Sequence, residues 1–197
     1  MHELLALFTE TEIFIFVFME IISKLDLSSR IMALKSTWKD KVIFIILFGA
    51  FSILGTLLGF QIEDGAITNV RDLGPLVAGL VGGPLMGGLA GLIGGIHRFF
   101  LGGLTAVPCG LSTILAGLIG GGIYLLNKKK LIGVFYAILL AIAVEVVHGL
   151  LTLLIARPLE EAWVVVRHAI PPMMIANGLG VAVSVIVMDR IKPKITE

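Results

Sequence analysis

The sequence predicts an all-α polytopic membrane protein with six to seven transmembrane helices, from three observations. Hydrophobic residues make up 57% of the 197 residues and charged residues 15%, which is too little charge to cover a soluble globule. The mean hydropathy is +1.05. The 24 glycines have no long polar tract to occupy, so they must lie within apolar segments, where glycine allows close helix packing.

Composition also excludes two other classes of protein. The formal net charge of +1 leaves no dense basic patch, so no nucleic-acid partner is expected. The one cysteine, Cys109, cannot supply a disulfide framework or a CxxC metal or redox site. With these classes excluded, the apolar composition predicts the lipid bilayer as the first partner.

Four apolar stretches approach or exceed the roughly 20 residues that cross a bilayer core. They are 4–23, 42–60, 131–155 and 171–188. The first is weakened by Glu10, Glu12 and Glu20; if it only lies along the surface, the count falls from seven passes to six. No basic region precedes this stretch, so we expect no cleavable signal peptide.

The apolar stretch 75–127 is too long for one pass and is interrupted twice. Gly82-Gly83-Pro84 is the first break, and Gly102-Gly103, followed by Pro108, is the second. We therefore expect three short, Gly-rich broken helices of about 17 residues each in the middle of the protein.

Basic residues fix the expected orientation. Eleven of the 15 lysines and arginines lie in the clusters 24–41, 128–130 and 190–194, which the positive-inside rule places in the cytoplasm. The loops 61–74 and 157–168, which contain Glu63, Asp64, Glu160 and Glu161, then lie outside. The N-terminus is expected outside and the C-terminus in the cytoplasm.

Glycine recurs every four residues in the middle segments. Gly79, Gly83, Gly87, Gly91 and Gly95 would share one helix face, along which a second backbone can approach closely. We expect these residues to serve helix packing around a small cavity.

A polar group is expected near the outer face, where three segments bring Arg71, Arg98, Cys109 and Ser112 to one depth. The planar fork of arginine suits carboxylates, so these residues are candidates for binding a small anion. The alternative is that Arg71 pairs with Asp72 and Arg98 extends to lipid headgroups. Cys109 has no evident neighbouring base, so we expect a pocket wall rather than a nucleophile.

A second polar group lies within the spans. Glu145 and His148 share a helix face, and Asn177 follows a helix start expected at Pro171-Pro172. Such residues could couple protons in a transporter, link helices in a receptor, or only fix packing. The candidates for coupling or for supporting the ligand residues are Asn69, His97, Thr113, Glu145, His148 and Asn177.

Motifs for catalysis are not found in the sequence. It contains no Walker loop, kinase glycine loop or HExxH, and no Ser-His-Asp arrangement is recognisable. His97 and His148 lie on separate segments, which is a poor basis for a metal site. We therefore expect no catalytic residue, no cofactor and no metal.

At these residues the sequence resembles the membrane region of LytS/YpdA-type sensor histidine kinases, the 5TM receptor of the LYT type. The core motifs are Asn69-Val70-Arg71, Gly82-Gly83-Pro84-Leu85-Met86-Gly87-Gly88, Gly94-Gly95-Ile96-His97-Arg98 and Gly102-Gly103-Leu104-Thr105-Ala106. Flanking matches are Thr37-Trp38-Lys39, Cys109 to Thr113, Glu145, Ala156-Arg157-Pro158, Pro172-Met173-Met174 and Asn177. The arginine-rich core is most similar to the pyruvate-sensing branch represented by BtsS.

The resemblance implies a receptor for extracellular pyruvate or a similar small carboxylate in the cell membrane, with Arg71, Arg98, Cys109 and Ser112 at the positions implicated in binding. It implies one sensor domain over 1–197, with a first helix and basic loop at 1–41 and a core receptor bundle at 42–190. Its implied partners are a second copy in a homodimer, a cytoplasmic kinase or output domain and a LytTR-type response regulator. The sequence ends at Glu197 without a phosphoacceptor or ATP-binding segment, so no enzyme activity is expected of it.

Two other classes stay open at this point. The Gly-Pro-Gly pattern is also similar to the substrate-binding S-components of ECF vitamin transporters, which implies similar packing and allows an uptake function. A transporter of small solutes would use Glu145 and His148 for coupling. The third possibility is a membrane scaffold without a ligand.

Overall fold

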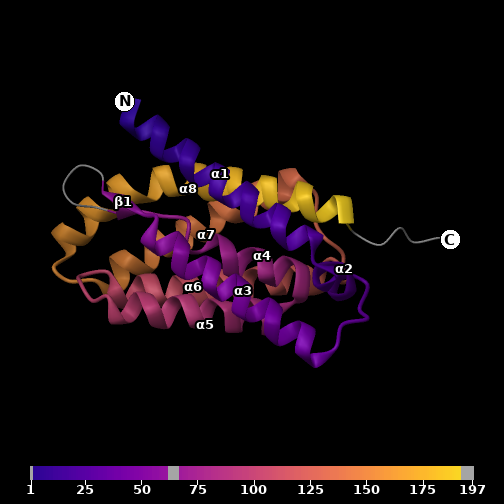
Figure 1. Cartoon of the computed structure of the whole chain (residues 1–197). Coiled ribbons are helices and arrows are strands. Elements are labelled where there is room, and N and C mark those ends of the chain that lie inside the picture. Colours follow the sequence, from indigo (N-terminus) through magenta and orange to yellow (C-terminus); the bar gives the residue numbers. More distant parts are fainter. Residues whose placement is uncertain (1, 62–66, 192–197) are drawn as a thin grey trace.

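The computed structural model describes residues 2–61 and 67–191, and nearly all of them are helical (Figure 1). The elements are α1 His2–Lys24, α2 Asp26–Met32, α3 Trp38–Leu57, β1 Phe60–Gln61, β2 Ile67–Thr68, α4 Leu73–Gly82, α5 Pro84–Phe100, α6 Ala106–Leu126, α7 Val134–Ile155 and α8 Leu159–Ile191. The two short strands pair antiparallel, Phe60 with Thr68. The expected outer acids Glu63 and Asp64 and the basic Lys192 and Lys194 lie outside the described residues.

Within the described residues, four helices are long and apolar enough to cross a membrane: α3, α6, α7 and α8. The prediction of a helical, multi-pass membrane protein is therefore confirmed. The expected count of six to seven passes and the orientation of the termini stay predictions.

The predicted breaks in the middle segments are present. Gly83 separates α4 from α5 with φ of 89°, and Pro84 occupies the first turn of α5, where no backbone donor is needed. Gly102 and Gly103, with φ of 71° and 85°, separate α5 from α6. L-residues with side chains rarely adopt such φ values, so glycine is what allows both breaks.

The expected three passes of equal length are wrong for α4. This helix has ten residues, about 15 Å, which is half of a bilayer core. All of its residues from Leu73 to Val81 are buried, and it contacts α3, α5, α6 and α8. Residues 69–72 precede it as non-helical chain, so α4 is a half-length helix that begins inside the protein.

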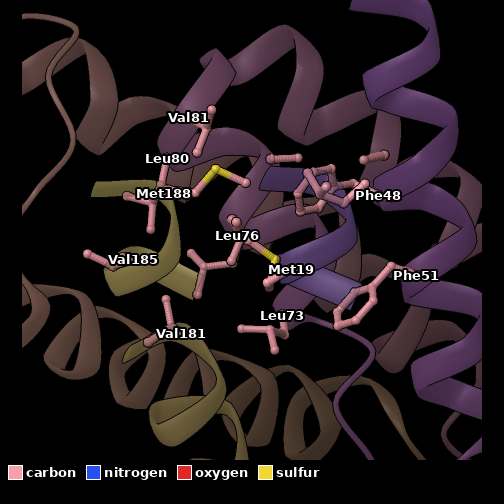
Figure 2. Close-up of a cluster of buried hydrophobic side chains, with 14 of the residues drawn as sticks. Met19, Phe48, Phe51, Leu73, Leu76, Leu80, Val81, Val181, Val185 and Met188 are labelled. Carbon is pink, nitrogen blue, oxygen red and sulfur yellow. The ribbon is translucent and has the colours of Figure 1, made fainter. Parts of the chain in front are cut away.

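The apolar core packs around α4 (Figure 2). Leu73, Leu76 and Leu80 of α4 lie between Phe48 and Phe51 of α3 on one side and the α8 residues on the other. The labelled α8 side chains are Val181, Val185 and Met188. This packing fixes the start of α4, and with it the position of the two residues just before the helix, Arg71 and Asp72.

The glycine prediction is confirmed with one change. A Cβ at Gly91 would lie 2.6 Å from the Thr113 carbonyl oxygen of α6, and one at Gly95 would lie 2.6 Å from that of Gly110. Gly79 and Gly87 face the α6 backbone at Gly117 in the same way. Gly83 differs because it forms the break rather than the packing face. The close approach holds the start of α6, with Cys109, Ser112 and Thr113, against α4 and α5.

The expected loop conformation of 157–168 and the expected helix start at Pro171 are wrong, while the outer location of this segment stays a prediction. Helix α8 begins at Leu159 and runs through Pro171 and Pro172 for 33 residues. An internal proline costs about 3 kcal/mol of helix stability, and burial can offset this. Ala169, Ile170 and Met173 around the prolines form a separate buried apolar cluster. Tertiary packing thus overrides the local signal.

Candidate functional site

A pocket of about 360 Å³ lies where the chain before α4, the loop between α5 and α6, and the helices α6, α7 and α8 meet. Its polar lining consists of Thr56, Asn69, Arg71, Arg98, Thr105, Cys109, His148 and Thr152. An apolar wall comes from α8, through Val165, Val166, Ala169, Ile170 and Met173. Three of the four predicted ligand residues, Arg71, Arg98 and Cys109, thus line one pocket.

Arg71 is fully buried, at 0% exposure, and its backbone is held on both sides. Its N–H donates to Asn69 Oδ1 at 3.2 Å, and Ser52 Oγ donates to its carbonyl oxygen at 2.9 Å. The guanidinium Nε donates to Thr113 Oγ1 at 2.7 Å. Nη1 and Nη2 are buried without a hydrogen-bond partner among the described residues. The fork is therefore fixed in place while its two terminal nitrogens stay available.

Asp72 supplies the counter-charge, as the alternative interpretation of Arg71 expected. Its Oδ1 lies 3.4 Å from Arg71 Nε and accepts from Thr113 Oγ1 at 2.6 Å. Its Oδ2 accepts from Ser112 Oγ at 3.0 Å and lies 3.1 Å from His148 Nδ1. Ser112 therefore lies behind the pocket, where it supports Asp72 rather than lining the cavity. From the sequence, Asp72 was expected only as a partner of Arg71.

Cys109 and His148 are in contact, which corrects the expectation that Cys109 has no neighbouring base. His148 Nε2 lies 3.2 Å from Cys109 Sγ, and both residues line the pocket. Since His148 Nδ1 faces Asp72 Oδ2, the three side chains form a continuous Cys-His-Asp series across α6, α7 and the start of α4. Cys109 and His148 are 39 positions apart, and the sequence between them carries no signal for this contact.

The second predicted polar group joins the first. Glu145 Oε2 lies 3.4 Å from His148 Nδ1, as the spacing on one helix face predicted. Asn177 Nδ2 of α8 donates to Glu145 Oε1 at 3.0 Å and to the Asn69 carbonyl oxygen at 3.3 Å. Asn177 thus joins α8 both to α7 and to the chain before α4.

Arg98 stands at the other side of the pocket in a different setting. It is half-buried; Nη1 donates to the Gly102 carbonyl oxygen at 2.8 Å and Nη2 to Thr105 Oγ1 at 2.9 Å. These bonds fold it over the loop between α5 and α6, beside the pocket that it lines, and the alternative of contact with headgroups stays a prediction. Its neighbour His97 does not line the pocket.

Asp72, Glu145 and His148 also have the donor atoms of a metal site, with one atom of each within 4.8 Å of the others. This set was not expected from the sequence. The Arg71 guanidinium already lies against Asp72, and Ser112, Thr113 and Asn177 already bond the two carboxylates. A positive ion placed beside Arg71 would meet charge repulsion. We therefore interpret the set as a hydrogen-bonded network.

Comparison with known proteins gives a consistent result. The family model described as 5TMR of 5TMR-LYT matches residues 25–191. Sensor histidine kinase BtsS of Escherichia coli K12 is 38% identical over 176 residues, covering 86% of this chain and 31% of BtsS. Sensor protein LytS of Bacillus subtilis strain 168 is 34% identical over 160 residues, covering 73% of this chain and 27% of LytS. The chain thus spans less than a third of either relative, and no solved structure matches it.

The family match covers the pocket, both arginines and the whole series of buried polar side chains. The matching relatives are membrane sensor kinases, in agreement with the apolar helices and with the family that the sequence motifs indicated. This multi-pass cell-membrane chain belongs to the 5TMR-LYT family, the membrane sensor domain of LytS- and BtsS-type histidine kinases.

Proposed function

We propose that the pocket binds pyruvate or a similarly small monocarboxylate from the outer side of the membrane, and that binding is relayed to a cytoplasmic output domain. The observation that carries this proposal is the Arg71 guanidinium, fully buried at the pocket with two terminal nitrogens that have no partner among the described residues.

A buried guanidinium that leaves two donors unbonded is unfavourable unless a ligand completes it. Nη1 and Nη2 form one end of the planar fork, which matches the two oxygens of a carboxylate. Asp72 balances only one positive charge, and its oxygens are already bonded by Ser112 and Thr113. Arg98 adds a second positive charge at the pocket, which favours an anionic ligand.

The rest of the pocket limits the ligand to a small molecule with an apolar end. A volume of about 360 Å³ is near the lower end of the range for ligand pockets. The wall of Ile170, Met173 and their α8 neighbours suits a methyl group rather than a second charge. A carboxylate at Arg71 with a short apolar end toward α8 describes pyruvate and its close analogues.

Helix α8 offers the relay. It contributes the apolar wall, bonds Glu145 through Asn177, and continues without interruption to Ile191. We expect a ligand that draws Arg98 and the loop between α5 and α6 toward Arg71 to shift α8 relative to the other helices. Such a ligand biases signalling only by binding one arrangement more tightly than the other.

The partners of the proposed sensor follow from the relatives. We propose a homodimer, a kinase or output domain on the cytoplasmic side after α8, and a LytTR-type response regulator downstream. The expected orientation, with the N-terminus outside, puts the pocket on the outer side.

The test is calorimetric titration of the purified chain with pyruvate, acetate, lactate and methyl pyruvate. We expect the three carboxylates to bind and methyl pyruvate, which lacks the negative charge, to bind at least about tenfold more weakly. Equal affinity for pyruvate and its methyl ester would contradict a carboxylate site at Arg71.

A transporter of the same ligand is separated by a second measurement. The sensor is expected to bind labelled pyruvate in proteoliposomes without accumulating it. Accumulation above passive leak, lost in Glu145→Gln, would favour the transporter.

A further inference from the structure

We propose that Cys109, activated by His148 and Asp72, adds reversibly to the keto carbon of a 2-oxo acid held by Arg71, so that the pocket selects 2-oxo acids by a covalent bond. This inference rests on the proposed carboxylate site and adds a chemical step to it.

The geometry is that of an activated nucleophile. A thiol becomes nucleophilic when a base within hydrogen-bond reach takes its proton, and the base works best when a third group orients it. His148 Nε2 lies 3.2 Å from Cys109 Sγ, and His148 Nδ1 lies 3.1 Å from Asp72 Oδ2. His148 Nδ1 makes no aligned hydrogen bond among the described residues, but the Asp72 carboxylate beside it favours the tautomer with the proton on Nδ1. In that tautomer the Nε2 lone pair is directed at the thiol.

A second carboxylate lies beside the same nitrogen of His148. Glu145 Oε2 lies 3.4 Å from His148 Nδ1 and has no hydrogen-bond partner among the described residues. Asp72 is itself fixed by Ser112 and Thr113. All of these side chains are at most 2% exposed, so the imidazole is held rigidly. A histidine serving only to pack helices would not need two carboxylates on one nitrogen and a thiol on the other.

A ligand in the pocket would contact both Arg71 and the pair formed by Cys109 and His148. Arg71 and Cys109 line the same cavity, and Arg71 Nη1 and Nη2, which have no partner within 2–61 and 67–191, provide the independent evidence for a ligand there. In a 2-oxo acid the electrophilic carbon is bonded directly to the carboxylate carbon. A carboxylate held at Arg71 therefore brings the keto carbon into the small cavity that Cys109 and His148 share.

The step balances without any other reactant. His148 Nε2 takes the thiol proton, and an electron pair of Sγ forms a bond to the keto carbon. The π pair of the carbonyl moves to its oxygen, which then receives the proton from Nε2. The product is a thiohemiketal with an uncharged hydroxyl and the negative charge of its carboxylate retained, and the reverse of these steps releases the ligand. Lactate and acetate have no keto carbon, so they can use only the Arg71 contact.

The direct test is carbon NMR of pyruvate labelled at its keto carbon and bound to the full chain in nanodiscs. We expect the bound signal to move from the ketone region to that of tetrahedral carbon, and to stay a ketone signal in Cys109→Ser. A ketone signal in the bound wild-type protein would overturn the proposal. Cys109 is the only cysteine in the sequence, so an adduct trapped there has one possible location.

The affinity test separates this inference from the proposed function. Wild-type protein should bind pyruvate at least about tenfold more tightly than lactate. Cys109→Ser should bring the two affinities within about threefold, because pyruvate loses the covalent bond that lactate cannot form. If pyruvate keeps its advantage in Cys109→Ser, the covalent step is wrong and the carboxylate site stands. If no carboxylate binds the wild-type protein, both proposals fail.

The role of His148 as the base is tested by a measurement that a change in helix packing alone would not alter. In His148→Gln, alkylation of Cys109 by iodoacetamide should slow at least about tenfold, while lactate still binds. Intact mass measures the alkylation. Unchanged alkylation in a folded His148→Gln variant would exclude His148 as the base.

Discussion

The two pocket arginines, Arg71 and Arg98, carry the same charge in opposite settings. Arg71 is fully buried, its Nε is fixed by Thr113, and its two terminal nitrogens have no partner among the described residues. Arg98 is half-buried, and its terminal nitrogens bond the Gly102 carbonyl oxygen and Thr105.

The difference suggests a division of tasks. Arg71 follows two short strands and precedes a half-length helix held in the apolar core, so it can move little. Arg98 is bonded to a loop that contains Gly102 and Gly103, which can change conformation at low cost. We therefore expect Arg71 to hold the ligand and Arg98 to close over it.

The largest effect is expected from Arg71→Met, which removes the buried fork but keeps an apolar side chain of similar length. Two charge-assisted hydrogen bonds are each worth about 1.5–3 kcal/mol, so pyruvate affinity should fall by more than about 100-fold. Calorimetry measures it. Arg71→Lys should restore little, because an ammonium cannot make the bidentate contact. Full rescue by lysine would argue against the fork.

Arg98→Ala should have a smaller effect, about 10- to 150-fold in affinity, because it removes one charged contact at the mobile side of the pocket. The thermal midpoint should stay close to that of the wild-type protein. Arg167→Ala is the matched control, since Arg167 is exposed and does not line the pocket. The division of tasks is wrong if Arg98→Ala costs as much as Arg71→Met.

Gly87→Ala should instead damage the scaffold that holds both arginines. A Cβ at Gly87 would meet the α6 backbone at Gly117, and such overpacking costs about 1–3 kcal/mol of stability. Thermal unfolding and size exclusion in detergent would report it. Gly122→Ala is the control, because a Cβ there has no atom within 4 Å. Equal stability of the two variants would contradict the close approach of α5 and α6.

The smallest effect is expected from Thr105→Val, which removes the hydroxyl that accepts from Arg98 Nη2. One neutral partner of a half-buried group is worth about 0.5–1.5 kcal/mol, so affinity should change by about two- to tenfold. Either direction is informative: weaker binding means that Thr105 positions Arg98 for the ligand, and tighter binding means that it holds Arg98 away. An unchanged affinity would show that Arg98 does not act through this loop.

Much of the fold was predictable from local signals. Gly83, Gly102 and Gly103 marked the breaks because only glycine adopts their φ values readily. The glycines at intervals of four predicted a close helix contact, which the structure places against α6. The helix start predicted at Pro171 and Pro172 was wrong, because packing around Ala169 and Met173 overcame the local preference of proline.

The site was predictable in part. The pair Arg71 and Asp72 is adjacent in sequence, and Glu145 and His148 are one helical turn apart, so their proximity follows from local geometry. Ser112 was expected in the pocket but lies behind it, because the rotation of α6 directs it at Asp72. The Cys109–His148 contact depends on the rotation of two helices at once.

By itself the sequence determined that the chain lies in a membrane, where its helices break and which polar residues interrupt its apolar spans. These properties depend on residue composition and on neighbours a few positions away. Only the tertiary structure decided that α4 is half-length and buried, that two nitrogens of Arg71 have no partner among the described residues, and that His148 lies between Cys109 and Asp72. Those outcomes are set by how closely the glycine faces let separate helices approach, and that distance is a property of the packed bundle.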